Sequence, residues 1–182
     1  MIETLDMHIL DLFQNAMASG ASEISVTMAC RPAEDRLTLE VSDNGRGMDE
    51  PTLAAVERGY YSSKCERCAG LGIPLLRQTA EHCGGAFAIS SRPGEGTTVT
   101  ASFQRSHIDL PPFGDLSETL LALLVTSDHR RVRLVCDCGS GFEVDTAELA
   151  TWLDDVPLSH PDVIGFLRAY LRERLAMTGL EP

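Results

Sequence analysis

Asp11 and Asn15 bring a carboxylate and an amide together in a segment whose apolar residues recur at helical spacing. Residues four positions apart on a helix lie one above the other, so both groups are presented on one face. Amide and carboxylate oxygens bind Mg²⁺, and a carboxylate in this position can orient or deprotonate a water or hydroxyl nucleophile. A solvated helix face has the same pattern and is the alternative for this pair taken alone.

A second candidate is Asp43, which ends an apolar strand and is followed by Gly45 and Gly47. Glycines allow the backbone to approach a flat ligand, and the carboxylate accepts hydrogen bonds from an exocyclic amine. Asp-Asn-Gly is also a common turn sequence, so this segment alone does not establish a ligand site.

Two glycine segments complete the set of candidates. Gly70-Leu-Gly72 stands at the start of an expected helix, where unpaired backbone amides and the positive end of the helix dipole favour phosphate oxygens. The later segment Gly94-Glu-Gly-Thr97 adds a flexible turn that carries a hydroxyl group. Taken singly, an ordinary helix start and an ordinary hairpin turn explain these segments equally well.

Helices and strands must position these groups. Residues 6–19 place apolar side chains at helical spacing, and Gly20 ends that helix. Residues 24–28 and 37–41 alternate apolar and polar side chains, which predicts two strands joined by a turn. The segment 49–69 has no strong periodicity.

Further along, the residues from Leu75 to Cys83 predict a helix with one apolar face. Pro74 suits its first turn and Gly84-Gly85 its end. Alternating runs at 87–89 and 99–103 then predict a hairpin.

Residues 1–106 are therefore expected to form one domain, and residues 107–182 a smaller α+β unit that docks a partner or regulates the first. Pro111-Pro112 is expected to be the linker, and Asp115 with Glu118 makes a capping box. The elements expected after it are a helix over 116–124, strands over 132–136 and 142–144, and a helix over 161–177.

In this order the segments resemble the ATP-binding domain shared by gyrase, heat-shock chaperones, histidine kinases and mismatch-repair ATPases, the GHKL superfamily. Residues 10–16 look like its N box, residues 43–48 like its adenine-binding box and residues 70–73 like its lid glycines. Residues 60–64 resemble the segment before the lid in histidine kinases, and residues 94–97 resemble their last glycine turn.

The resemblance implies a Bergerat-type α/β sandwich, in which a mixed, mostly antiparallel sheet carries helices on one face. It implies ATP and Mg²⁺ as cofactors, with the metal bound by Asn15 and the adenine amino group by Asp43. The remaining positions that it assigns to the nucleotide are Gly45, Gly47, Met48, Gly70, Gly72 and Thr97.

Two residues are catalytic candidates on the same resemblance. Lys64, the only lysine of the chain, would reach a terminal phosphate from a mobile lid, although a lone exposed lysine is an equal alternative. Asp11 stands where the family usually has glutamate, so its carboxylate is one methylene shorter. ATP binding is therefore a firmer expectation than ATP turnover.

Charge and composition limit the partners. The 182 residues carry 15 basic and 27 acidic side chains, a net charge of −12, which opposes unspecific binding to nucleic acid. The acidic start lacks the features of a signal peptide, and no apolar run approaches the length of a membrane span. A cytoplasmic protein without membrane contact is expected.

Cysteines offer other chemistry. In a cytoplasmic protein thiols stay reduced, so the six cysteines are expected to be free or metal-bound. Cys65 and Cys68 have two-residue metal spacing, and Cys136 and Cys138 are expected near a hairpin tip. The two pairs could form one four-thiolate site, the first pair could make the lid sensitive to oxidation, or all four could simply be small apolar residues.

The sequence thus predicts an Mg²⁺-dependent ATP-binding protein that acts as an ATPase, or as a serine/threonine-type kinase on a partner protein. The alternative is a regulatory module whose partner binding is switched by the nucleotide without significant turnover.

Overall fold

The computed structural model describes residues 4–58, 72–154 and 156–180. Along the chain, the helices and strands are α1 (Leu5–Ala18), β1 (Glu23–Arg31), a 3₁₀ turn (Pro32–Glu34), β2 (Arg36–Asp43), α2 (Glu50–Glu57), α3 (Gly72–His82), β3 (Phe87–Arg92), β4 (Gly96–Gln104), α4 (Leu116–Val125), β5 (Arg131–Asp137), β6 (Phe142–Asp145), α5 (Thr146–Trp152) and α6 (Pro161–Ala176).

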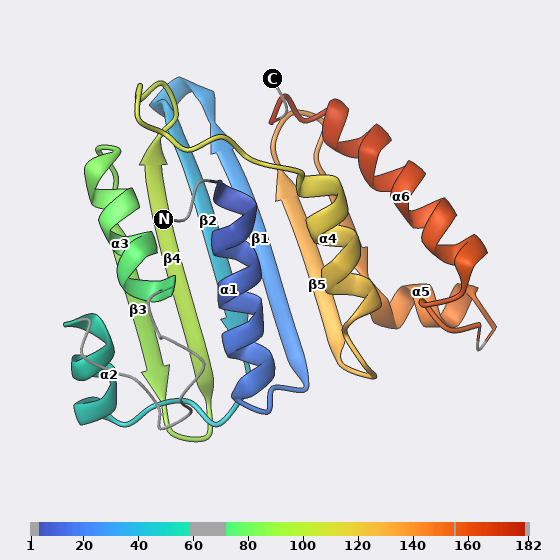
Figure 1. The fold of residues 1–182 in the computed structure, drawn as a ribbon, viewed down its shortest axis with the longest axis horizontal. Helices are drawn as coiled ribbons and strands as arrows, with labels where there is room; N and C mark the ends of the chain where they lie inside the picture. The colour runs from blue at the N-terminus through green and yellow to red at the C-terminus, as the bar shows by residue number, and fades with distance from the viewer. Residues whose placement is uncertain (1–3, 59–71, 155, 181–182) are drawn as a thin grey trace.

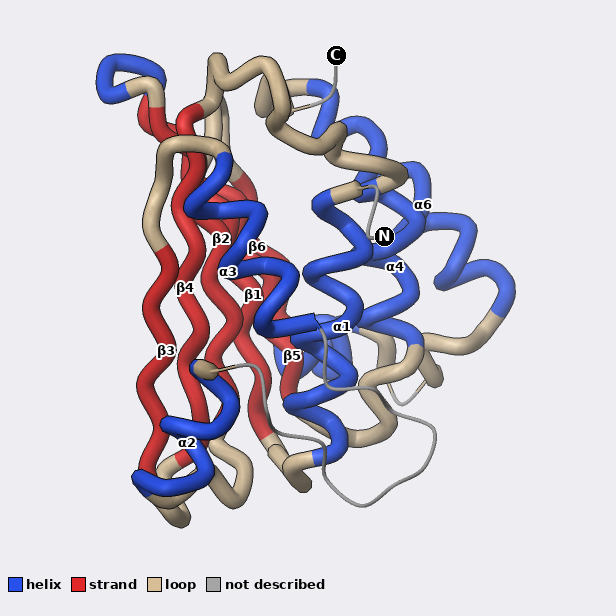
Figure 2. Tube along the Cα trace, turned by 60° about the vertical axis from the view of Figure 1, so that its left-hand side comes forward, coloured by secondary structure: helices blue, strands red, loops and turns tan. Residues whose placement is uncertain are grey.

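One six-stranded sheet, in the order β3-β4-β2-β1-β5-β6, forms one layer of the molecule. All neighbouring strands run antiparallel except β1 and β5, which are parallel. Figures 1 and 2 show α1, α3 and α4 together over one face of this sheet. The predicted α/β sandwich, with a mixed and mostly antiparallel sheet and its helices on one face, is confirmed.

The core lies between these two layers because alternate residues of each strand point toward the helices. Phe13 of α1, Leu76 of α3 and Leu123 of α4 meet them there, each at most 2% exposed. The strand residues buried in this layer are Ile24, Val26, Met28 and Cys30 of β1, Leu37, Leu39 and Val41 of β2, Val99, Ala101 and Phe103 of β4, Val132, Leu134 and Cys136 of β5, and Phe142 and Val144 of β6.

Two short helices were not expected from the sequence. Helix α2 begins at the N-cap Asp49, whose side chain accepts a hydrogen bond from the Thr52 amide at 3.0 Å, and it buries only Val56. Helix α5 is seven residues long and buries only Thr146. Neither helix is long enough to show the repeating apolar stripe that identifies a helix in a sequence.

The strands of residues 131–145 continue the sheet of the first part of the chain, because β5 pairs with β1 along its whole length. Helix α4 packs against both α1 and α6. Asp115 caps α4 as expected, accepting from the Glu118 amide at 3.0 Å. The Glu118 carboxylate does not complete the capping box, because it pairs instead with Arg168 and Arg172 of α6.

The first turn of α1 is tied to the start of α4. Asp6 is buried, and its Oδ2 accepts hydrogen bonds from the Asp115 amide at 3.0 Å and from the Thr119 hydroxyl at 3.3 Å. The backbone amide of Leu5 donates to the carbonyl of Pro112 at 2.9 Å. The helix that carries Asp11 and Asn15 is therefore anchored directly to the C-terminal part of the chain.

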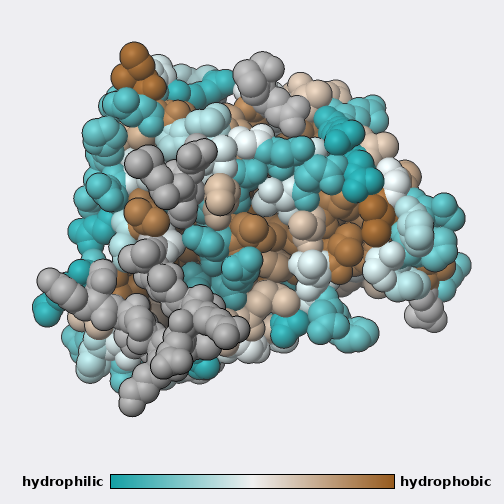
Figure 3. Space-filling view, in the orientation of Figure 1, coloured by the Kyte–Doolittle hydropathy of each residue, from teal (hydrophilic) through white to brown (hydrophobic). Residues whose placement is uncertain are grey.

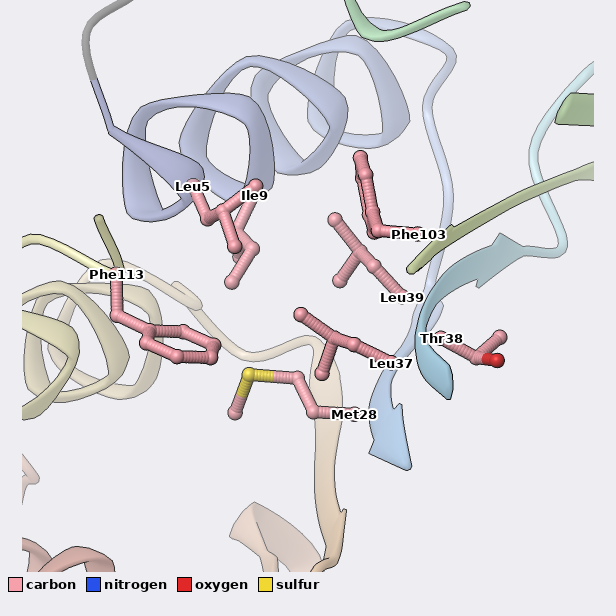
Figure 4. A pocket seen from close by; sticks show the side chains of 8 residues that line it. All are labelled: Leu5, Ile9, Met28, Leu37, Thr38, Leu39, Phe103 and Phe113. Atoms are coloured by element: carbon pink, nitrogen blue, oxygen red, sulfur yellow. The ribbon is translucent and has the colours of Figure 1, made fainter. Parts of the chain in front are cut away.

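A small hollow lies between the first turns of α1 and the sheet. Figure 4 shows Leu5 and Ile9 above it, Phe113 at one side, and Leu37 and Leu39 facing it from β2. Its lining is apolar, and it lies near the start of β2, whereas Asp43 ends that strand. The hollow therefore offers nothing to bind a nucleotide and is separate from the candidate residues.

His8 is the other buried polar group of α1, with only 1% of its surface exposed. Its Nε2 lies 3.5 Å from the Thr79 hydroxyl of α3, and its Nδ1 has no hydrogen-bond partner among the described residues. Burial lowers the pKa of His8 from 6.5 to about 4. Because unfolded His8 takes up its proton near pH 6.5, acid favours the unfolded chain.

We expect His8 to remove about 2 to 3 kcal/mol from the free energy of unfolding as the pH falls from 7 to 4. The His8→Gln variant cannot take up this proton, so its loss over the same range should be smaller by that amount. Urea unfolding of both proteins at the two pH values measures the difference. Equal losses in the two proteins would contradict the prediction.

Candidate functional site

Asp43, the last residue of β2, is the centre of the candidate site. The sheet register places it opposite Ile24 of β1 and Thr97 of β4. The C-terminal end of α1, the end of β2 and the β3–β4 turn lie along the same edge of the molecule (Figure 1). Two predicted site residues, Asp43 and Thr97, are therefore direct neighbours although 53 residues separate them in the sequence.

The Asp43 carboxylate is half-buried and held by several donors. Its Oδ1 accepts from the Gly45 amide at 2.7 Å and lies 3.2 Å from the Ser19 hydroxyl, which also lies 2.8 Å from the Ala16 carbonyl oxygen. The Thr97 backbone is near enough to lower the pKa of the carboxyl group. Burial is the largest influence and raises the pKa of Asp43, and these donors partly oppose it. The carboxylate is therefore a fixed hydrogen-bond acceptor at the end of β2, beside the C-terminal end of α1.

The glycines that follow Asp43 are required by packing within the protein. A Cβ on Gly45 would lie 1.8 Å from Ser19 Oγ, and a Cβ on Gly47 would lie 1.8 Å from the carbonyl oxygen of Arg92. Gly47 also has a positive φ of 63°. The sequence suggested that these glycines let the backbone approach a ligand, and the structure adds a reason that needs no ligand.

The loop after Asp43 is fastened on both sides. Asn44 Oδ1 accepts from the amides of Ser22 and Glu23, each at 2.9 Å. The Met48 amide donates to Ser91 Oγ at 2.8 Å, and that hydroxyl lies 2.9 Å from Thr97 Oγ1. Met48, another predicted site residue, is thus held beside the strand that carries Thr97.

Gly96 brings the hairpin turn against the same loop. A Cβ on Gly96 would lie 1.9 Å from the Asp43 carbonyl oxygen, and the φ of Gly96 is 100°. The Gly94 amide donates to the carbonyl of Arg46 at 2.8 Å. The predicted glycine turn and the predicted Asp43 loop therefore form one closely packed unit.

Asp11 and Asn15 lie on α1 as predicted, one turn apart. Asp11 is half-buried, and burial raises its pKa. A Cβ on Gly72, the first residue of α3, would lie 2.8 Å from Asp11 Oδ2, so Gly72 packs directly on the carboxylate. Lys64 and Gly70, as well as Cys65 and Cys68, lie outside the described residues.

The Asn15 side chain is exposed, and its amide makes no hydrogen bond within the described part of the chain. It is therefore available to a ligand at the C-terminal half of α1. Its side-chain oxygen is a hard donor of the kind that Mg²⁺ prefers, and the Asp11 carboxylate lies one turn earlier on the same helix. The donor set fits the expected metal.

Three supporting residues were not found from the sequence: Ser19, Asn44 and Ser91. Each uses a hydroxyl or amide oxygen to hold a loop in place, through the bonds described above. The Asp-Asn-Gly turn sequence drew attention to the segment that contains Asn44. Ser19 and Ser91 belong to no motif in the sequence.

Comparison with known proteins matches residues 2–107 to the family described as histidine kinase-, DNA gyrase B-, and HSP90-like ATPase. The sensor histidine kinase ZraS of Klebsiella oxytoca is 32% identical over 99 residues, which are 54% of this chain and 21% of ZraS. The sensor protein kinase FleS of Pseudomonas aeruginosa is 35% identical over 98 residues, 54% of this chain and 24% of FleS. The chain thus spans about a quarter or less of these relatives.

Among solved structures, the N-terminal domain of a DNA repair protein is similar in fold. The TM-score is 0.50 at 16% sequence identity, and the match covers 79% of this chain and 52% of that one. This similarity supports the arrangement of helices and strands.

Within the described residues, the helices are all too short or too polar to cross a membrane.

Proposed function

The chain belongs to the family of histidine kinase-, DNA gyrase B-, and HSP90-like ATPases, and on this premise we propose that it binds ATP at the edge formed by α1, the end of β2 and the β3–β4 turn. The observation that carries the proposal is the half-buried Asp43 carboxylate. It is fixed by Gly45, Ser19 and Thr97. A fixed acceptor of this kind suits the exocyclic amine of adenine.

We propose that Mg²⁺ accompanies the nucleotide, with Asn15 as its protein ligand. When bound, the metal would neutralise charge on the phosphates. The exposed, unbonded amide of Asn15 and its position one turn after Asp11 support this assignment. Gly72, which packs on Asp11, would place the backbone at the start of α3 beside the same groups.

We further propose that the terminal phosphate is transferred to water or to a serine or threonine hydroxyl of a partner protein. Asp11 would orient this nucleophile and accept its proton, a role helped by the raised pKa of its carboxyl group. Lys64 is proposed to contact the terminal phosphate. The proposed docking unit for the partner is residues 107–182, where Trp152 is 77% and Phe166 is 65% exposed.

The helix-covered face shown in Figure 3 is mixed, with brown apolar residues scattered among teal hydrophilic ones. Met7 and Leu10 of α1 are among the exposed large apolar side chains, at 48% and 37%. These residues lie on the helix that carries Asp11 and is anchored to α4. This arrangement supports the second candidate, a module whose partner binding depends on the nucleotide at α1.

Calorimetric titration with ATP in the presence of Mg²⁺, followed by a phosphate-release assay, tests the proposal. Saturable binding is expected, and absence of binding would overturn the function as proposed. Release of phosphate, or labelling of a partner by [γ-³²P]ATP, would support the enzyme. Binding without either reaction would support the nucleotide-switched module.

Asn15→Ala is expected to weaken ATP binding about tenfold in Mg²⁺, because one oxygen ligand of the metal is lost. In EDTA the variant and the wild type should bind ATP equally. Gln14→Ala is the matched control, since Gln14 is an exposed neighbour on the same helix. An equal loss of affinity with and without Mg²⁺ would contradict the metal role of Asn15.

Ser19→Ala is expected to weaken ATP binding about three- to tenfold, because Asp43 loses the hydroxyl contact that helps to orient its carboxylate. Loss of this donor should also raise the pKa of Asp43, so affinity should decline at a higher pH than in the wild type. Ser19→Thr keeps the hydroxyl and should restore part of the affinity. Ser102→Ala is the control, because Ser102 is a half-buried serine of β4 whose hydroxyl accepts from the Ala86 amide and not from the Asp43 loop. Calorimetry over a pH series is the measurement.

A further inference from the structure

Three buried cysteines lie together where the first part of the chain meets the last. Cys30 is in β1, Cys136 is in β5, and Cys138 directly follows β5. They are 7%, 2% and 2% exposed, respectively. We call them the thiol cluster. Family membership covers residues 2–107, so only Cys30 belongs to the matched segment.

The parallel pairing of β1 with β5 fixes the register of the thiol cluster. Met28 pairs with Cys136 and Ala29 pairs with Asp137, so Cys30 and Cys138 occupy the next position along the two strands. Adjacent strands lie about 4.8 Å apart. That separation falls within the Cα separation of about 4.4 to 6.8 Å found for disulfide-bonded cysteines.

An ion pair clamps the two strands at this position. Arg31 follows Cys30, Asp137 precedes Cys138, and their side chains meet at 2.6 Å. Arg31 Nη1 also donates to the carbonyl oxygens of Cys30 at 3.0 Å and of Asp137 at 3.4 Å. The neighbours of both cysteines are thus bonded to each other across the strands, which keeps Cys30 and Cys138 side by side.

The side chains of the thiol cluster lie close enough to influence one another. Cys138 is the largest influence on the Cys30 thiol and raises its pKa, and Cys136 is the largest influence on the Cys138 thiol and raises its pKa. Cys138 Sγ lies 3.9 Å from the Met28 carbonyl oxygen. Within the described ranges, no group of three or more His, Cys, Asp or Glu side chains is arranged to hold a metal ion. Thiol oxidation is therefore the chemistry that the cluster offers.

We propose that Cys30 and Cys138 are a redox-active pair that forms a reversible disulfide. Glutathione disulfide, or another low-molecular-weight disulfide, is the oxidant. The two cysteine thiols lose two electrons and two protons, one S–S bond forms between them, and the oxidant is reduced to two thiols. Because both cysteines are buried, the oxidant reacts during local opening of the strand ends.

Cys138 has a second possible partner in Cys136, but the geometry favours Cys30. Residues two apart in an extended strand have Cα atoms about 6.6 Å apart, at the upper end of the disulfide range. The bond to Cys30 would close a loop over residues 31–137 and join β1 of the family-matched segment to β5 beyond it. The disulfide would therefore lock the two parts of the chain together.

Peptide mapping of the oxidised full chain identifies the pair directly. The protein is reduced, incubated with glutathione disulfide, alkylated and cleaved before aspartate residues. This cleavage separates Cys30 in peptide 11–34, Cys136 in peptide 128–136 and Cys138 in peptide 137–144. The expected product is peptide 11–34 linked to peptide 137–144, and it should disappear when the sample is reduced again.

Variants and thermal unfolding provide the second readout. Oxidation should raise the Tm of the wild type by roughly 10 °C, as expected for a disulfide that closes so long a loop. The rise should be lost in Cys30→Ser and in Cys138→Ser, and kept in Cys136→Ser and in Cys83→Ser, whose buried thiol lies elsewhere. A link between peptides 128–136 and 137–144, or no link among the three peptides, would overturn the proposal.

Discussion

Replacing Asp43 by alanine is expected to weaken ATP binding at least about 100-fold. A hydrogen bond to a charged acceptor in a buried site contributes about 1.5 to 3 kcal/mol, and its loss also leaves the adenine amino group unpaired. A loss of about 3 kcal/mol corresponds to a change of more than 100-fold in Kd. Calorimetric titration with ATP in Mg²⁺ measures the change.

The conservative variant Asp43→Asn separates loss of the ligand contact from damage to the loop. Asparagine keeps an acceptor for the Gly45 amide at the position of Oδ1, so the loop after β2 should hold its shape. It places an amide where the adenine amine requires an acceptor, and ATP binding should fail as in the alanine variant. A Tm close to that of the wild type would show that the fold survives.

A carboxylate elsewhere on the same strand supplies the control. Glu40 lies three residues before Asp43 on β2, is half-buried, and accepts from the Thr100 hydroxyl at 3.1 Å. Glu40→Gln should bind ATP as the wild type does. If Asp43→Asn bound ATP with unchanged affinity, Asp43 would not be the adenine acceptor.

The pH dependence offers an independent check on Asp43. Burial raises its pKa, so the carboxyl group takes up a proton at a higher pH than an ordinary aspartate. Affinity for ATP should therefore decline on acidification as Asp43 becomes protonated. The weak residual affinity of Asp43→Asn should lack this decline, because its side chain does not titrate in this range.

Local patterns in the sequence were sufficient to predict the elements of the site. The helical spacing of residues 6–19 and the alternation in residues 37–41 report which face of each element is buried, and α1 and β2 follow them. Pro93-Gly-Glu-Gly predicted the hairpin turn between β3 and β4. These features depend on neighbouring residues only.

Features that depend on distant pairing were not accessible in this way. Nothing near Glu23–Arg31 or Arg131–Asp137 in the sequence indicates that β5 adds to β1 in parallel, because more than 90 residues separate the two strands. The thiol cluster is a consequence of that pairing. The single residue between Cys136 and Cys138 drew attention to these cysteines, but their position beside Cys30 depends on the sheet.

The contact between Ser19 and Asp43 shows the same limit on a smaller scale. Ser19 follows α1 and precedes Gly20, so in the sequence it marks only the end of a helix. Its hydroxyl reaches the carboxylate because the end of α1 packs beside the end of β2. A single serine can therefore complete a site without any motif of its own.

Replacing Asp11 by asparagine is expected to lower the rate of phosphate release at least about 100-fold and to leave ATP affinity within about twofold. General base catalysis by a positioned side chain contributes a factor of about 10² to 10⁴, and asparagine cannot accept the proton. The side chains are nearly equal in size, so the packing of Gly72 on this position should be preserved.

Single-turnover phosphate release and calorimetry on the same preparations measure the two quantities. A fall in rate at constant affinity would show that Asp11 acts on the nucleophile and not on the bound nucleotide. Gln14→Ala, on the exposed face of the same helix, should change neither quantity. Equal rates in the wild type and in Asp11→Asn would remove Asp11 from the chemistry.

A pH profile measured at saturating ATP extends this test to the protonation state of Asp11. Burial raises its pKa, and the base acts only in its ionised form, so the rate at saturation should decline on acidification. Gly72 packs against Asp11 Oδ2, so the start of α3 is in contact with the carboxylate that titrates. If the wild type binds ATP but releases no phosphate at any pH, the result would support the nucleotide-switched module. The contact between Gly72 and Asp11 would then link the position of α3, through α1, to α4.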